Sequence, residues 1–188
     1  MNTIDIFMDL EGLGISWDRS TGIRKIDFIT DTLPTALEQE NYTISTLTGF
    51  ARYKHKNSIE QRSIQTMVRN KFSSYGWKMV WSNEIADLAL IKDAEERLLK
   101  NSLAPTVMLV TNDHDFIKIT RKITNSGRFV IISGPNMSKR LQHVAGKSFP
   151  FWQFLGGHPE KILPDDTDAS RHIANNESIR NPILIPGF

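Results

Sequence analysis

The feature that most constrains this chain is a short apolar run that ends beside two acids. Residues 107–110 (Val-Met-Leu-Val) have the character of a strand buried on both faces of a parallel sheet. Asp113 and Asp115 follow shortly after it. The next apolar residues recur at helical spacing, as Phe116, Ile119 and Ile123. Gly127 then ends the pattern, so the segment predicts a strand, an acidic loop and a helix, and ligands of open α/β sheets bind at that edge.

Two interpretations of these acids stay open when they are taken alone. Asp113 can be an ordinary helix N-cap, and Asp115 then suits the positive end of the helix dipole. A functional role gains support because the first expected strand, residues 3–9, also ends in an acid, Asp9. The loop after it contains Gly12, and a glycine lets the backbone approach a ligand closely. The same arrangement thus recurs at two strand ends.

The length and composition indicate one globular domain. Of the 188 residues, 39% are hydrophobic and 23% are charged, which excludes a disordered or membrane-embedded chain. No apolar run approaches the roughly 18 residues of a transmembrane helix, and acidic residues interrupt the first segment too early for a signal peptide. Cysteine is absent, so disulfides and thiolate metal sites are excluded. We therefore expect a cytoplasmic protein without a membrane partner.

The distribution of charge says more than the net charge of +2. Basic residues concentrate in the middle of the chain, at Arg62, Arg69, Lys71, Lys78, Lys118, Arg121, Lys122, Arg128, Lys139 and Arg140. This distribution suggests a basic face that could meet a nucleic acid. Solvated helix faces carry the same residue types, so the pattern is weak by itself.

The hydrophobic pattern predicts alternating strands and helices. Expected strands cover residues 3–9, 42–53, 77–81, 107–110 and 128–133, and expected helices cover residues 23–40, 58–76, 83–99, 113–127 and 138–149. Pro34 is expected to divide the first helix into two short ones. The alternation is typical of a three-layer α/β/α sandwich with a mainly parallel sheet of about five strands. We assign residues 1–150 to this domain and residues 151–188 to a C-terminal extension, extended or packed on the domain.

Several expectations concern packing rather than chemistry. Ser58 and Gln61 have the spacing of a capping box, and Ser138 is expected to be a helix N-cap rather than a phosphate contact. Core candidates of the helix that follows Ser58 are Ile64, Met67, Val68, Phe72 and Tyr75. Those of the next helix are Ile85, Leu88, Ile91, Leu98 and Leu99, and those of the last are Leu141, Val144, Ala145 and Phe149. The aromatic cluster at residues 151–154 is expected to pack rather than to stack on bases.

Right-handed crossovers place the ends of parallel strands at one edge of the sheet. Four acids are expected to converge there, namely Asp9, Asp87, Asp113 and Asp115. Neighbouring carboxylates cannot all ionise without a compensating charge, and Mg²⁺ or Mn²⁺ with oxygen ligands provides it. That chemistry favours hydrolysis at phosphorus, since no cysteine and no serine in a nucleophile elbow supports acyl transfer. His114 is the only histidine near the acids.

Three segments resemble, in order, the acidic motifs of NYN domains, which belong to the PIN-like ribonuclease superfamily. They are residues 7–13 (Phe-Met-Asp-Leu-Glu-Gly-Leu), 80–94 (with Ala-Asp-Leu-Ala-Leu-Ile-Lys-Asp-Ala at its end) and 109–116 (Leu-Val-Thr-Asn-Asp-His-Asp-Phe). The pattern of Ser138, Leu141, Ala145 and Phe149 is similar to that of the closing helix of the family. The resemblance covers residues 3–149, and four matches in order are more specific than any one motif.

The resemblance implies a PIN-like, metal-dependent endoribonuclease that acts on single-stranded or structured RNA. It implies that Asp9 and Asp113 bind Mg²⁺ or Mn²⁺ directly or through water. Asp87 and Asp115 would complete the cluster or orient the attacking water. Glu11 and Asn112 are candidates for an assisting role. The RNA-binding candidates along the helix after Asp115 are Lys118, Arg121 and Lys122, whose spacing also fits an exposed helix face.

Two departures from the family pattern keep other functions open. NYN domains usually have Asn where this chain has Gly12, and often have Gly where it has Asn112. Gly12 favours a non-catalytic RNA-binding or regulatory module, whereas the four retained acids favour an enzyme. The segment Asp-Leu-Glu-Gly at residues 9–12 is also loosely similar to the first motif of haloacid dehalogenase-like phosphatases, but Glu11 stands where that class has a second aspartate. A homodimer stays open as well.

Overall fold

A six-stranded parallel sheet forms the centre of the protein in a computed structural model that describes residues 1–15, 20–52 and 59–157. The strands are β1 (Asn2–Asp9), β2 (Tyr42–Arg52), β3 (Lys78–Ser82), β4 (Thr106–Val110), β5 (Phe129–Gly134) and β6 (Lys147–Pro150). The helices are α1 (Ser20–Gln39), α2 (Ile59–Ser74), α3 (Ala86–Leu99), α4 (Ile117–Asn125), α5 (Lys139–Val144) and α6 (Phe151–Phe154), with a 3₁₀ turn, η1 (His114–Phe116). The predicted α/β architecture is confirmed.

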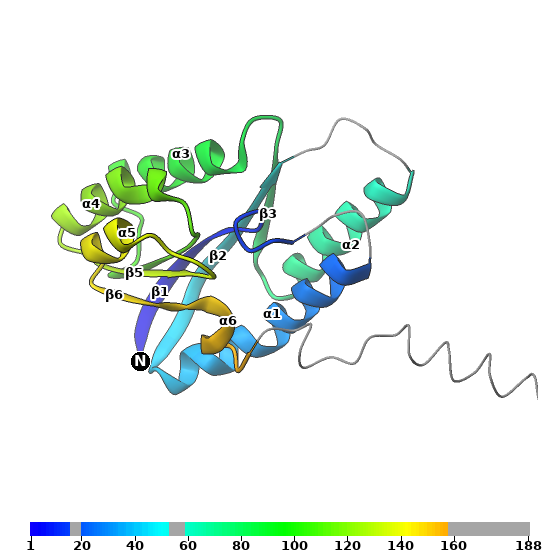
Figure 1. The fold of residues 1–188 in the computed structure, drawn as a ribbon, viewed down its shortest axis with the longest axis horizontal. Helices are drawn as coiled ribbons and strands as arrows, with labels where there is room; N and C mark the ends of the chain where they lie inside the picture. Colours follow the sequence, from blue (N-terminus) through cyan, green and yellow to red (C-terminus); the bar gives the residue numbers. More distant parts are fainter. Residues whose placement is uncertain (16–19, 53–58, 158–188) are drawn as a thin grey trace, which may run out of the picture.

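Helices cover both faces of the sheet, as Figure 1 shows. One core lies between the sheet and α1, α2 and α6, and it takes Ile4, Ile6 and Met8 from β1. The second core lies beneath α3, α4 and α5, and it takes Phe7 from the same strand. Successive side chains of a strand point to opposite faces, so this alternation fixes which face each residue of β1 meets. The result is the expected three-layer sandwich.

The strand order, β3-β2-β1-β4-β5-β6, reverses its direction of growth between β1 and β4. Every pairing in the sheet is parallel. After β1 the chain adds β2 and then β3 on one side of that strand. It then returns to the other side of β1 and adds β4, β5 and β6 there. The crevice outside the carboxyl ends of two such central strands is where open α/β sheets bind ligands. In this protein the residues at that point are Asp9 and the loop that follows Val110.

Two predictions about the elements are wrong. The sheet has a sixth strand, β6, which contains Phe149, a residue expected on a helix. Helix α5 ends at Val144, and the chain then pairs with β5, where the Ser133 hydroxyl donates to the Phe149 carbonyl at 3.0 Å. Helix α1 continues through Pro34 instead of dividing. Its apolar residues before and after Pro34 are buried in one core, and this packing holds the helix together.

Some core candidates also proved wrong. Met67 and Tyr75 of the α2 region are exposed, as are Ile85, Leu88 and Leu99 of the α3 region. Helix α3 begins at Ala86, and its buried residues are Ala86, Leu90 and Ala94. The small alanine side chains allow the helix to lie close to the sheet, and a choice based on hydrophobicity overlooks them. The capping box at Ser58 and Gln61 lies outside the residues whose side chains are described.

The aromatic cluster after β6 is a packing element, as predicted. Phe151, Trp152 and Leu155 are buried in the core beneath α1. Residues 158–188, which make up most of the expected extension, lie outside the described part of the chain. Among the described helices, none has the length and apolar character needed to cross a lipid bilayer.

Candidate active site

The alternation of strand side chains directs Asp9 and Thr111 toward the face that α3 covers. In β1 the second core takes Phe7, and Asp9 lies two residues further on. In β4 the same core takes Val107 and Leu109, and Thr111 follows at the same two-residue interval. Met8 and Val110 are paired in the β1–β4 register, so Asp9 and Thr111 meet at the end of that pairing. The Thr111 hydroxyl donates a hydrogen bond to Asp9 Oδ2 at 3.4 Å.

Asp9 is the buried centre of the site. Its side chain is held by two donors, since the backbone N–H of Gly12 donates to Oδ1 at 2.9 Å and Thr111 donates to Oδ2. Only 3% of Asp9 is exposed. Burial raises the pKa of Asp9, the Gly12 N–H opposes this, and the nearby charge of Glu11 raises the pKa further. A cation at this point would relieve the cost of ionising the carboxyl group.

Asp87 comes to Asp9 from the first turn of α3. Burial, then the negative charges of Asp9 and Asp113, raise its pKa to about 7, and a hydrogen bond with the Asp9 side chain adds to the shift. The helix N-terminus favours a negative charge, but here burial and the neighbouring acids outweigh that effect. Near neutral pH, Asp87 therefore shares a proton with Asp9 unless a cation is bound.

Asp113 is both a helix cap and a member of the acidic group. Its Oδ1 accepts the Asp115 backbone N–H at 2.9 Å, so the expected N-cap role is confirmed. The Asp113 backbone N–H donates to the Thr111 hydroxyl at 3.2 Å, which ties this loop to Asp9. Capping leaves the Asp113 carboxylate close enough to act on Asp87 electrostatically. The two interpretations that the sequence left open are therefore compatible.

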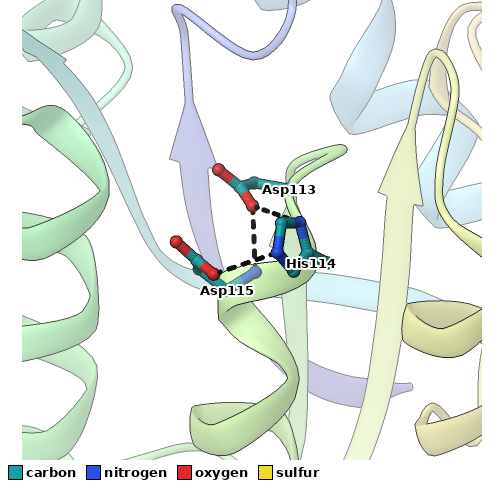
Figure 2. A group of neighbouring side chains, drawn as sticks. All are labelled: Asp113, His114 and Asp115. Carbon is teal, nitrogen blue, oxygen red and sulfur yellow. Dashed lines mark hydrogen bonds and ion pairs between the residues drawn. The ribbon is translucent and has the colours of Figure 1, made fainter.

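His114 lies between Asp113 and Asp115, as Figure 2 shows. Its Nδ1 is 3.3 Å from Asp113 Oδ1, and its Nε2 is 3.4 Å from Asp115 Oδ1. One ligand atom from each of the three residues lies within 4.8 Å of the others, a spacing that a metal ion can bridge. Asp115 and His114 are exposed, so the group opens to solvent.

Two neighbours shape the site around these acids. Glu11 accepts the Arg52 backbone N–H through Oε1 at 3.3 Å, and its charge raises the pKa values of Asp9 and Asp87. Asn112 lies beside Gly12, because a Cβ atom placed on Gly12 would be 3.2 Å from Asn112 Oδ1. Both residues suggested as assisting groups therefore lie next to the acids.

The three basic candidates on the helix after Asp115 differ in their surroundings. Lys118 is exposed. Lys122 pairs with Glu95 of α3 at 2.5 Å. Arg121 instead lines a groove between α4 and α5. Elsewhere on the expected basic face, Lys71 forms ion pairs with Asp27 and Asp31. Ser138 accepts the Leu141 backbone N–H at 3.2 Å, so it is a cap, as predicted.

The donor set fits a hard divalent cation. All four acids offer carboxylate oxygens, the ligands that Mg²⁺ and Mn²⁺ prefer. Burial, together with neighbouring negative charge, raises the pKa values of Asp9 and Asp87, so a bound cation would lower the cost of ionising them. Asp113 and Asp115 belong to the group whose ligand atoms lie within 4.8 Å of one another, and Asp9 and Asp87 are the neighbouring acids that would add further carboxylate oxygens for such an ion.

Comparison with known proteins identifies the family. The family model of the NYN domain matches residues 12–151. The chain belongs to the NYN domain family. It is thereby a member of the PIN-like superfamily, and the matched region extends from the loop after Asp9 to the start of α6. NYN domains are generally ribonucleases that depend on divalent metals. This agrees with the acidic group that lies where the strand order reverses, between β1 and β4.

A solved structure shares the fold of this NYN domain. It is the crystal structure of VPA0982, a protein of unknown function from Vibrio parahaemolyticus RIMD 2210633. The two chains are 16% identical with a TM-score of 0.55, and the alignment covers 79% of this chain and 92% of the other. A search of curated proteins found no match. The likeness supports the fold, whereas the chemistry must be argued from the residues of this chain.

The sequence interpretation missed Thr111. This residue joins the two halves of the acidic group, because its hydroxyl donates to Asp9 and accepts from the Asp113 backbone. Its position two residues before an acid, at the end of a buried strand, was the available signal. A threonine at the end of a strand is an ordinary strand residue by its propensity, and its role becomes visible only when the pairing of β1 with β4 is known.

Proposed function

We propose that this NYN domain is a metal-dependent endoribonuclease that hydrolyses RNA phosphodiester bonds. The observation that carries the proposal is the pair of carboxyl groups with raised pKa values, Asp9 and Asp87, at the point where the strand order reverses. Perturbed acids in such a crevice are typical of functional sites. Family membership supports the same chemistry.

Asp9, Asp87, Asp113 and Asp115 would hold Mg²⁺ or Mn²⁺. Such an ion neutralises charge on phosphoryl oxygens and lowers the pKa of a bound water. The chain itself contributes orientation: Gly12 and Thr111 fix Asp9, and the cap to the Asp115 N–H fixes Asp113. Without a bound ion, Asp87 is partly protonated near neutral pH, since its pKa is about 7. Glu11 and Asn112 would assist from the rim.

The second candidate is an RNA-binding module that keeps the fold without cleaving. Gly12 favours it, because the amide that the family usually carries at this position is absent. Asn112 lies beside Gly12, however, and offers an amide from the loop after β4 instead. The retained acids and their shared proton therefore favour catalysis. A phosphatase acting on small phosphate esters is the remaining alternative.

Cleavage of a labelled RNA panel tests the proposal. The substrates are a single strand, a hairpin and a transfer RNA, each with Mn²⁺, Mg²⁺ or EDTA. We expect metal-dependent cutting that falls by about 100-fold or more in Asp113→Asn, whereas Asp93→Asn, on α3 but outside the acidic group, retains it. RNA that binds but is not cut would support the non-catalytic module. Hydrolysis of a small phosphate ester without cutting of RNA would support the phosphatase.

A further inference from the structure

A groove of about 620 Å³ separates α4 from α5 on the face of the sheet that carries the acidic group. The two helices lie side by side in Figure 1. The groove is lined by Ile117, Arg121, Lys139, Arg140, His143 and Val144. Three of these residues are permanently cationic and none is acidic. The groove therefore attracts anions, and Ile117 and Val144 give it an apolar part.

The cations of this groove are available for a ligand. Arg121, Lys139 and Arg140 are exposed, and none of them pairs with a carboxylate in the described part of the chain. Lys122 offers a contrast on the same helix, because its ammonium group already pairs with Glu95 of α3. The two residues thus differ: Lys122 is neutralised by Glu95 of α3, and Arg121 is not.

The groove begins beside the acidic group. Ile117 follows directly after η1, the turn that contains His114 and Asp115. Helix α5 contacts both η1 and α4, so the groove continues from that turn along the pair of helices. A strand with a phosphate at the acidic group would have its neighbouring phosphates within reach of this row of cations.

We propose that the α4–α5 groove binds the backbone of single-stranded RNA next to the scissile phosphate, through Arg121, Lys139 and Arg140. Guanidinium and ammonium groups bind phosphate oxygens, and the His143 ring can stack on an unpaired base over the apolar part. A duplex hides its bases and cannot use His143 in this way. The inference rests on the proposed function, since it concerns the substrate of the same site.

Binding of a fluorescent single-stranded oligoribonucleotide of about 20 nucleotides, measured in EDTA, tests the groove directly. We expect Arg121→Ala, Lys139→Ala and Arg140→Ala each to weaken binding by about 3- to 10-fold, and the triple variant by about 30-fold or more. The slope of log affinity against log salt should fall by about 0.7 for each cation removed. Arg69→Ala is the matched control and should change binding by less than about 2-fold, because Arg69 is exposed on α2, which covers the opposite face of the sheet.

Two results would contradict the proposal that the groove binds single-stranded RNA. One is equal loss in Arg69→Ala and Arg121→Ala, which would indicate a general charge effect. The other is a duplex of the same sequence that competes as well as the single strand. Arg121→Lys keeps the charge and should retain most of the affinity, which separates loss of a phosphate contact from loss of folding.

Cleavage distinguishes failure of the groove from failure of the proposed function. The triple variant should raise KM for the long single strand by about 10-fold or more while kcat stays within about 2-fold, because the cations bind substrate away from the acids. Unchanged KM in an active protein would overturn the groove and leave the nuclease intact. Tight, groove-dependent binding without any cleavage would leave the groove intact and overturn the nuclease.

Discussion

Gly12 and Asp9 fit together so closely that no side chain can be added between them. A Cβ atom placed on Gly12 would lie 2.2 Å from Asp9 Oδ2 and 3.0 Å from Asp9 Cγ. The Gly12 N–H donates to the other oxygen, Oδ1, at 2.9 Å. The glycine therefore supports the buried carboxylate in two ways, by a hydrogen bond and by leaving the space that Oδ2 occupies. The departure from the family pattern at this position has a structural role.

Gly12→Ala should displace the Asp9 carboxylate. Asp9 is buried and held by two hydrogen bonds, so it cannot move freely aside. We expect activity to fall by about 100-fold, as for a catalytic group misplaced by about 1 Å, and stability to fall by about 1–3 kcal/mol. Metal-dependent cleavage and the midpoint of urea unfolding measure the two effects.

The exchange variant Gly12→Asn/Asn112→Gly sharpens this test. It restores the arrangement that the family usually has and removes the 3.2 Å contact with Asn112 Oδ1, but the contact with Asp9 remains. We expect it to be as inactive as Gly12→Ala. An exchange variant with wild-type activity would mean that Asp9 can adopt a second productive position.

Asp87 should make the metal-free protein less stable as the pH rises. Its pKa is about 7 in the folded protein, against an ordinary value of 3.8, so between these values folding retains a proton that the unfolded chain has released. The free energy of unfolding therefore falls from about pH 4 to about pH 7. Asp87→Asn removes this loss and should gain about 1 kcal/mol at pH 8, after allowance for solvent screening of a partly exposed group.

Thermal unfolding in EDTA at pH 4 and pH 8 measures this effect. For a domain of this size we expect the Tm of Asp87→Asn to exceed that of the wild type by about 2–4 °C at pH 8 and to match it at pH 4. Asp93→Asn, on the same helix but outside the acidic group, should follow the wild type. A lower Tm for Asp87→Asn at pH 8 would contradict the raised pKa.

The fold was largely predictable because its main signals are local. The apolar run before Asp113 and the helical spacing of Phe116, Ile119 and Ile123 predicted β4 and the helix after it, and all three side chains are buried. Phe149 shows where this fails. Its apolar side chain suited a helix pattern, yet it lies in β6 because the free edge of β5 was available for pairing. The pairing of two strands that are far apart in the chain produces no periodic pattern in the sequence of either strand.

The candidate site was predictable in its acids but not in its connections. Asp9 and Asp113 could be recognised because each follows a buried strand, and crossover handedness brings those ends together. Thr111 could not, since its role depends on the β1–β4 register. The same holds for Lys139 and Arg140, which were part of a diffuse basic distribution. Only the packing of α5 on α4 places them in one groove.

Addition of Mg²⁺ or Mn²⁺ should stabilise the protein. A divalent ion offsets the burial and the neighbouring negative charges that raise the pKa values of Asp9 and Asp87, and the unfolded chain offers no such cluster. At an ion concentration of about 100 Kd, linkage predicts a gain of about 2.7 kcal/mol, or roughly 5–10 °C in Tm. Asp113→Asn should lose most of this shift, whereas Asp93→Asn should keep it. Equal shifts in both variants, or in NaCl of matched ionic strength, would contradict a specific site.

Thr111→Val should uncouple the two halves of the acidic group. The valine side chain has nearly the same shape, but it lacks the hydroxyl that donates to Asp9 Oδ2 and accepts the Asp113 N–H. Loss of these bonds in a buried position costs about 1–3 kcal/mol of stability. We expect cleavage to fall by about 10-fold, with a larger effect on kcat than on KM, since the acids lose their mutual orientation while the basic groove is untouched.

Thr111→Ser is the matched control, because it keeps the hydroxyl and removes only a methyl group. It should retain activity within about 3-fold and lose about 1 kcal/mol or less. Steady-state cleavage and urea unfolding of the two variants provide the comparison. If Thr111→Ser lost as much activity as Thr111→Val, packing of the methyl group would matter more than the hydroxyl. The coupling of Asp9 to Asp113 through Thr111 would then be wrong.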